Sequence, residues 1–177
     1  MFPELPLKKN TNSDHPILFK IIMLAAGLLT GFICVKFFFL QMSINTDSMN
    51  PTLKTGDKVV INKTSAIRKG DIIAFNSPAE DGKIVISRVI ALEYETVEIR
   101  NKIVFVNDNK TDIISDATRD EKIIYPMKFC YRDNMPPVRM ERNEFFVLGD
   151  NFDKGFDSRS FGKISKSAII GKIIYKR

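Results

Sequence analysis

The sequence predicts a mostly β fold that is preceded by one transmembrane helix. Three observations support this: a long apolar run near the N-terminus, short runs of β-branched and aromatic residues between turn residues in the remainder, and no helical period longer than two turns there. The length of 177 residues suits one domain with a tail. An apolar content of 44% and a charged content of 27% exclude a disordered or collagen-like chain.

The first expected element is a transmembrane helix over residues 17–40. Residues 21–35 carry no charge, and the apolar character resumes after Lys36. As a helix, residues 17–40 would be about 36 Å long, which is enough to cross a bilayer core. Residues 37–42 are bulky and offer no small-residue cleavage site. We therefore expect the segment to be retained as an anchor rather than removed as a signal peptide.

Lysines near the start of the apolar run predict the orientation of the anchor. Lys8, Lys9 and Lys20 favour a cytoplasmic N-terminus. Residues 1–16 are then a cytoplasmic tail, and residues 43–177 form an extracytoplasmic domain. The protein is expected to be a single-pass protein of the cytoplasmic membrane.

Composition excludes several kinds of site from the outer domain. The one histidine, His15, lies across the membrane from it, so a histidine-based zinc site or a histidine base is excluded there. Cys34 lies in the span and cannot pair with Cys130, which we expect to be a buried free thiol. The net charge of +6 does not require nucleic acid, because an anionic membrane surface explains it equally well.

The outer domain is expected to consist of short strands separated by turns, with no internal repeat. The turns are marked by Gly, Asp and Asn. The expected strands cover residues 58–61, 72–75, 84–92, 97–99, 103–106, 145–148 and 169–175. Residues 107–143 are polar, charged and contain three prolines, and we expect them to form a small inserted cap.

Three segments of the domain carry candidate chemistry. The first is Asp-Ser-Met-Asn-Pro-Thr-Leu over residues 47–53, the second is the strand 84–92 with Ser87-Arg88, and the third is Gly-Asp-Asn at 149–151 followed by residues 157–162. Each alone is an ordinary turn, strand or polar loop. In this order after one membrane span, they resemble the bacterial type I signal peptidases, or leader peptidases.

The resemblance covers about residues 20–177 and rests on four boxes in the family's order. Residues 48–53 match the nucleophile box, and residues 56–63 match the strand after it. The remaining matches are residues 69–75 with Pro78, residues 88–90, residues 149–153, residues 157–159 and Gly162. The resemblance implies the signal-peptidase-type β fold with a small inserted cap, and neither a metal nor a cofactor.

The family cleaves signal peptides from translocated proteins with a serine–lysine dyad. The resemblance makes Ser48 the nucleophile, and its backbone N–H together with the Thr46 hydroxyl would form the oxyanion hole. A serine needs a base to remove its proton, and a lysine serves when burial disfavours its ammonium form. The implied partners are signal peptides of preproteins and membrane lipids, with the secretion translocon as a further candidate and no nucleic acid.

One departure from the family is serious. The position of the family lysine, directly before Arg88, is Ser87, and the position where many members have a supporting serine is Gly155. Another lysine could supply the base: Lys83 would be about 13 Å from Ser87 along a strand, whereas Lys154 on a flexible loop is the candidate substitute. Alternatively, the protein has slow or conditional activity, or is a silent homologue that binds signal peptides or an active peptidase.

The remaining charged residues of the boxes have structural interpretations. Arg88, Asp150 and Arg159 are expected to form an ion-pair network under the site, with Asp157 as further support. Turn residues Asp57 and Asp71 are expected to stabilise their turns. If a lysine is introduced at Ser87, a serine at Gly155 is expected to help hold it.

Overall fold

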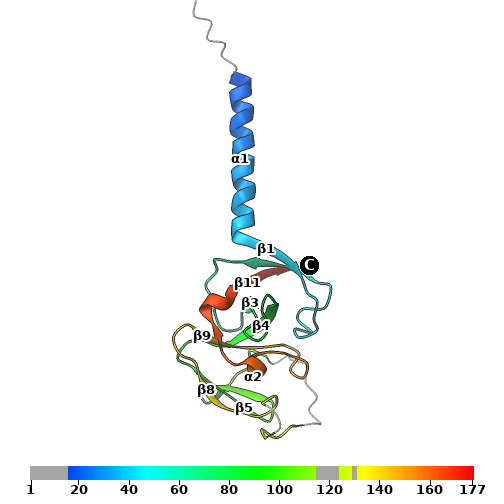
Figure 1. The fold of residues 1–177 in the computed structure, drawn as a ribbon, viewed down its shortest axis with the longest axis vertical. Helices are drawn as coiled ribbons and strands as arrows, with labels where there is room; N and C mark the ends of the chain where they lie inside the picture. Colours follow the sequence, from blue (N-terminus) through cyan, green and yellow to red (C-terminus); the bar gives the residue numbers. More distant parts are fainter. Residues whose placement is uncertain (1–15, 115–123, 129–130) are drawn as a thin grey trace, which may run out of the picture. The chain divides into compact units, whose positions relative to one another are not determined.

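The computed structural model describes residues 16–114, 124–128 and 131–177. The chain divides into two compact units, residues 1–37 and residues 38–177, and each is described by itself (Figure 1). Residues 1–15 of the predicted tail, which include His15, lie outside the described residues, as does Cys130.

The first unit contains nearly all of one helix, α1 (Pro16–Phe38), which is long and apolar enough over Ile17–Phe38 to cross a membrane. It ends two residues before the predicted boundary. Phe39 and Leu40, which the sequence placed in the span, begin strand β1 (Phe39–Ser43) instead. They do so because their backbones pair with Asn62 and Ile61 of the next strand.

The larger unit holds a seven-stranded antiparallel sheet in the order β1-β2-β11-β3-β4-β9-β10. Its further strands are β2 (Lys58–Asn62), β3 (Ile72–Asn76), β4 (Ile84–Ala91), β9 (Glu144–Leu148), β10 (Ile164–Ser165) and β11 (Ile169–Lys176). The last strand, β11, lies between β2 and β3 and pairs with both. Two short helices precede it, α2 (Ser158–Phe161) and the 3-10 helix η1 (Lys166–Ala168).

A second sheet has four strands in the order β7-β6-β5-β8. They are β5 (Thr96–Arg100), β6 (Ile103–Val106), β7 (Asn109–Lys110) and β8 (Met135–Arg139), and Figure 1 shows β5 and β8 in a layer apart from β3 and β4. The segment predicted to be an inserted cap, residues 107–143, therefore contributes two strands to a sheet that starts before it.

Buried side chains place the first box inside the core. Met49 is 1% exposed and Leu53 is 2% exposed, and both pack with Val59 and Ile61 of β2. Burying such side chains contributes about 1.5–3 kcal/mol each relative to exposure. The turn that carries Ser48 is thus anchored by two buried side chains that follow that residue.

Two turns of the larger unit have the same construction, although the sequence was expected to contain no internal repeat. Each has a glycine with positive φ, +95° at Gly56 and +82° at Gly70, followed by an aspartate and a strand. Asp57 accepts a hydrogen bond from the backbone N–H three residues earlier at 2.8 Å, and Asp71 does the same at 2.8 Å. The prediction that both aspartates stabilise their turns is confirmed.

Candidate active site

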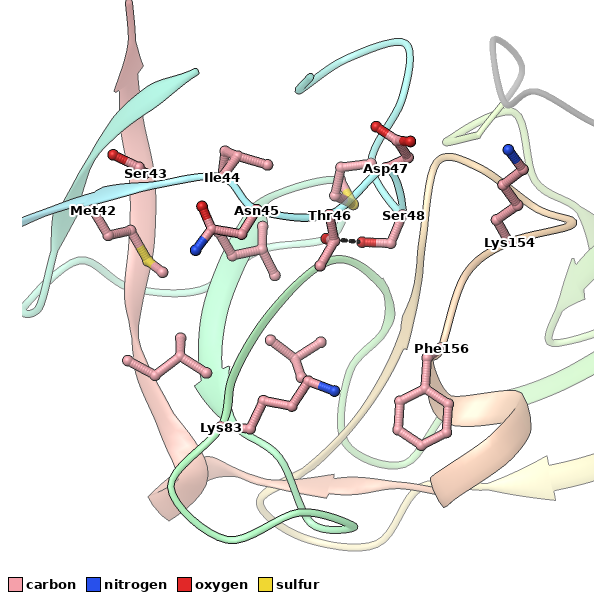
Figure 2. Close-up of a pocket in the computed structure, with 14 residues that line it drawn as sticks. Met42, Ser43, Ile44, Asn45, Thr46, Asp47, Ser48, Lys83, Lys154 and Phe156 are labelled. Carbon is pink, nitrogen blue, oxygen red and sulfur yellow. Dashed lines mark hydrogen bonds between the residues drawn. The ribbon is translucent and has the colours of Figure 1, made fainter. Parts of the chain in front are cut away.

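The Ser48 hydroxyl is presented by a tight turn that begins four residues after the end of β1. Within the turn, the Asn50 N–H donates to the Asp47 carbonyl at 3.1 Å and the Leu53 N–H donates to the Met49 carbonyl at 2.9 Å. Ser48 is partly exposed, and its Oγ lies 3.0 Å from Thr46 Oγ1 (Figure 2). The two hydroxyls that the sequence singled out are therefore hydrogen-bonded neighbours.

Ser48 lines a pocket of about 320 Å³ between two extended segments. One wall is residues 42–49 and the other is residues 83–86, with Lys154 and Phe156 from a later loop. The walls are largely apolar, with Met42, Ile44, Met49, Ile84, Val85 and Ile86. An extended peptide could enter such a pocket beside the serine hydroxyl.

The segment that leads to Ser48 is held by the first of the two equivalent turns. The Ile44 N–H donates to the Asp57 carbonyl at 2.9 Å, and the Gly56 N–H donates to the Ile44 carbonyl at 2.8 Å. The Thr55 hydroxyl also donates to the Asp47 carboxylate at 2.8 Å. This side of the pocket is thus fixed immediately before the candidate nucleophile.

The strand that carries Ser87 is held by the second turn with the same pair of bonds. The Val89 N–H donates to the Asp71 carbonyl at 2.8 Å, and the Gly70 N–H donates to the Val89 carbonyl at 2.8 Å. Ser87 itself lies on β4 opposite Ile73 and is 1% exposed. It is not among the residues that line the pocket.

The last box packs directly against the carbonyl of Ser48. The Asn151 N–H donates to that carbonyl at 2.9 Å. A Cβ added at Gly149 would lie 2.6 Å from the same oxygen, so the close approach requires glycine. The Thr52 hydroxyl donates to the Asp150 carboxylate at 2.5 Å, which joins the two boxes a second time.

The predicted ion-pair network consists of two separate pairs. Arg88 binds Asp150 through Nε at 2.8 Å and Nη2 at 2.5 Å, and Arg159 binds Asp157 through Nε at 2.8 Å and Nη2 at 2.6 Å. Arg159 therefore pairs with Asp157 and not with Asp150. Asp157 is fully buried and also accepts the Gly149 N–H at 3.0 Å, so it supports the contact with Ser48.

The environment of Gly155 contradicts the expectation that a serine there would help a lysine at Ser87. A Cβ added at Gly155 would lie 2.7 Å from Asp157 Oδ2 and 3.0 Å from the Asn151 carbonyl oxygen. A serine side chain would collide with the buried carboxylate that binds Arg159. The position is closed by packing, which the sequence pattern could not reveal.

Two lysines line the pocket. Lys154 lies on the loop beside Ser48, and Figure 2 shows its amine directed away from the Ser48 hydroxyl. Lys83 lies on the other side of the pocket, 2.7 Å from the Glu80 carboxylate and 5.9 Å from the centre of the Phe156 ring (Figure 2). Lys83 is an even number of residues from Ser87, so strand alternation predicted both side chains on the same face. No sequence motif pointed to Phe156 as a residue of the site.

Comparisons with known proteins show what the chain is similar to. The family described as "Signal peptidase, peptidase S26" matches residues 17–176. Signal peptidase IB of Staphylococcus aureus is 30% identical over 167 residues, covering 88% of this chain and 86% of the relative. Probable signal peptidase I-1 of Synechocystis is 34% identical, covering 75% and 68%. A solved signal peptidase I from Enterococcus faecalis is 26% identical, covers 62% of this chain and 98% of its own, and has a TM-score of 0.47.

Proposed function

The chain belongs to the signal peptidase family, peptidase S26, and we propose that it is a membrane-anchored serine endopeptidase that removes signal peptides from translocated preproteins. Ser48 is the nucleophile in this proposal. The observation that supports it most is the Ser48 hydroxyl, bonded to Thr46 at the edge of an apolar pocket. The anchor, α1, is a helix of suitable length and apolarity.

The reaction is an acyl transfer in two steps. A base removes the proton from Ser48 Oγ, which attacks the scissile carbonyl carbon, and the protonated base then gives the proton to the leaving amine. The Ser48 N–H and the Thr46 hydroxyl donate to the oxyanion. Water, activated by the same base, hydrolyses the acyl-enzyme. Lys154 is the proposed base, because its loop lies beside Ser48 and its long side chain can turn toward the hydroxyl.

Strand pairing offers a way to hold the substrate. β4 pairs with β3 along residues 84–88, but its pairing with β9 begins only at Arg88. Within the described residues, the edge of residues 84–87 opposite β3 therefore has no strand partner, and residues 84–86 line the pocket. An extended peptide can add to such an edge through main-chain hydrogen bonds.

The proposed site lies outside the cytoplasm, where preproteins emerge at the bilayer. This follows from the lysines near the start of α1 and gives the enzyme access to signal peptides, to lipids and to the secretion translocon. Protease added to intact cells, with any outer wall removed, should digest the part after residue 43 and spare the N-terminus. A cytoplasmic signal from a C-terminal reporter would contradict this orientation.

The proposal is tested by cleavage of a preprotein with the purified full chain in detergent. Ser48→Ala should reduce cleavage to background while leaving the unfolding transition unchanged, because one partly exposed oxygen is lost. Ser160→Ala is the matched control, since Ser160 is exposed and lies outside the pocket lining, and it should cleave at the wild-type rate. Wild-type cleavage by Ser48→Ala would remove Ser48 as the nucleophile.

A second candidate function is a silent homologue that binds signal peptides or an active peptidase. The observation that favours it is Ser87 at the position of the family lysine, since loss of the base in well-studied serine proteases costs on the order of 10⁶ in turnover. This candidate predicts that the folded wild type binds a signal peptide without cleaving it. It also predicts that no lysine substitution at Ser87 creates activity.

A further inference from the structure

Two lysines of the last strand reach the two equivalent turns. Lys172 Nζ lies 2.7 Å from the Asp71 carboxylate, and Lys176 Nζ lies 3.2 Å from the Asp57 carboxylate. The two side chains are similarly placed, 29% and 43% exposed. They differ in one contact: Lys176 also donates to the carbonyl of Thr52 at 2.7 Å.

Thr52 belongs to the turn that presents Ser48. Its hydroxyl is held by Asp150 at 2.5 Å, and its carbonyl is held by Lys176. The next residue, Leu53, is buried and closes the turn onto the Met49 carbonyl. A shift at Thr52 would therefore pass along the three residues that separate it from Ser48.

We propose that Lys176 is a positioning residue that fixes the Ser48 turn through the Thr52 carbonyl. Its catalytic consequence rests on the proposed function, in which Ser48 is the nucleophile. The ammonium of Lys176 bridges two acceptors, the Thr52 carbonyl and the Asp57 carboxylate, so it joins the turn after Ser48 to the turn that holds Ile44 before it. Both flanks of the nucleophile are then tied to one cation of β11.

Charge suits Lys176 to this role. An ammonium has three donors and no acceptor, so one group can serve a carbonyl and a carboxylate together. The backbone N–H of Lys54 lowers the pKa of Asp57, partial desolvation opposes the shift, and the Lys176 ammonium lowers the pKa further. Asp57 is thus a carboxylate at neutral pH and available to pair with Lys176.

The test compares Lys176→Met with Lys172→Met in the full chain in detergent. Both changes remove one charge and one ion pair from the same strand, but only the first removes a contact with the Ser48 turn. In Lys176→Met, amide exchange at Leu53 and Asn151 should quicken by about threefold to tenfold, because both N–H groups bond within or onto the turn. In Lys172→Met, exchange at these two amides should match the wild type.

Activity supplies a second readout. Where the wild type cleaves a preprotein, Lys176→Met should lower kcat by about threefold to tenfold with little change in KM, because misplacing the nucleophile affects the reaction and not the binding. Lys176→Arg should restore kcat, since a guanidinium can also donate to both acceptors. Lys172→Met should leave kcat at the wild-type value.

The outcomes separate this proposal from the proposed function. An inert wild type that still shows the exchange contrast supports the role of Lys176 and removes the peptidase assignment. Equal exchange at Leu53 and Asn151 in the two variants overturns the role of Lys176, whether or not the wild type cleaves. An unchanged kcat for Lys176→Met in an active protein overturns it as well.

Discussion

The segment before Ser48 and the strand that carries Ser87 are held by turns of the same construction, yet they differ in what they carry. Each turn makes the same pair of backbone bonds, to Ile44 on one side and to Val89 on the other. The first side presents a hydroxyl to the pocket. The second side carries Ser87, a buried serine, at the position where the family resemblance predicts a lysine.

The two sides therefore differ in how firmly the structure holds the proposed nucleophile and the proposed base. On the nucleophile side, the Ser48 carbonyl is bonded by Asn151 and Thr52 is bonded by Asp150, so the hydroxyl has a fixed place. On the base side, the proposed base Lys154 is on a loop, and its amine points away from Ser48 (Figure 2). We therefore expect removal of the Ser48 proton to limit the rate of the enzyme.

The largest expected effect comes from Gly149→Ala on the nucleophile side. The new methyl group would lie 2.6 Å from the Ser48 carbonyl oxygen, so the turn must shift. Cleavage should fall to the level of Ser48→Ala, and the free energy of unfolding should drop by about 1–3 kcal/mol. Denaturant unfolding of the same sample shows whether the protein is still folded. A folded variant that cleaves at the wild-type rate would contradict the requirement for close packing.

On the base side, Lys154→Ala should abolish the native cleavage. Lys154→Arg should not restore it, because a guanidinium cannot be deprotonated in proteins and so cannot accept the serine proton. Lys166→Ala is the control for the loss of a positive charge, since Lys166 is exposed and outside the pocket lining. If Lys154→Ala cleaves normally, the base is another group.

Lys83→Ala is expected to change KM more than kcat, since Lys83 lies across the pocket from Ser48.

The smallest effect concerns the turn before β2. Since the pKa of Asp57 is lowered, its carboxylate stabilises the fold fully above its ordinary pKa of about 3.9, and this is lost as the pH falls through the lower folded value. Asp57→Asn should therefore show a shallower loss of stability between about pH 4 and pH 2. Urea unfolding of the full chain in detergent across this range measures how the free energy of unfolding depends on pH. Parallel curves for the two proteins would contradict the role of the carboxylate.

Local sequence patterns predicted most of the first sheet. The runs at residues 58–61, 72–75 and 84–92 correspond to β2, β3 and β4 within one residue at their ends. β1 was missed because its first residues continue the apolar run of the helix, and only pairing with β2 ends that helix at Phe38. β8 was missed because it contains Pro136 and Pro137, which the second sheet tolerates on its edge strand.

Some features of the candidate site could likewise be predicted from the sequence, and others could not. Thr46 and Ser48 are two residues apart, so their proximity could be predicted from the sequence, and their hydroxyls do form a hydrogen bond. The placement of Phe156 and the closed space at Gly155 depend on how the last loop packs against Asp157. Phe156 meets Lys83 of a distant segment. Gly155 is closed by Asn151, Asp157 and Arg159 of its own loop, and no residue pattern encodes how tightly that loop folds on itself.

The central claim is that the scaffold is intact and that only a fixed lysine is missing. It is tested most directly by the rate at which Ser87→Lys cleaves a preprotein, measured beside the wild type and the double variant Ser48→Ala/Ser87→Lys. We expect a rate at least about tenfold above the wild type, because general-base catalysis contributes about 10²–10⁴-fold and the new lysine lacks a supporting serine. It also predicts no cleavage by the double variant. A folded Ser87→Lys protein that cleaves no faster than the wild type would contradict the claim.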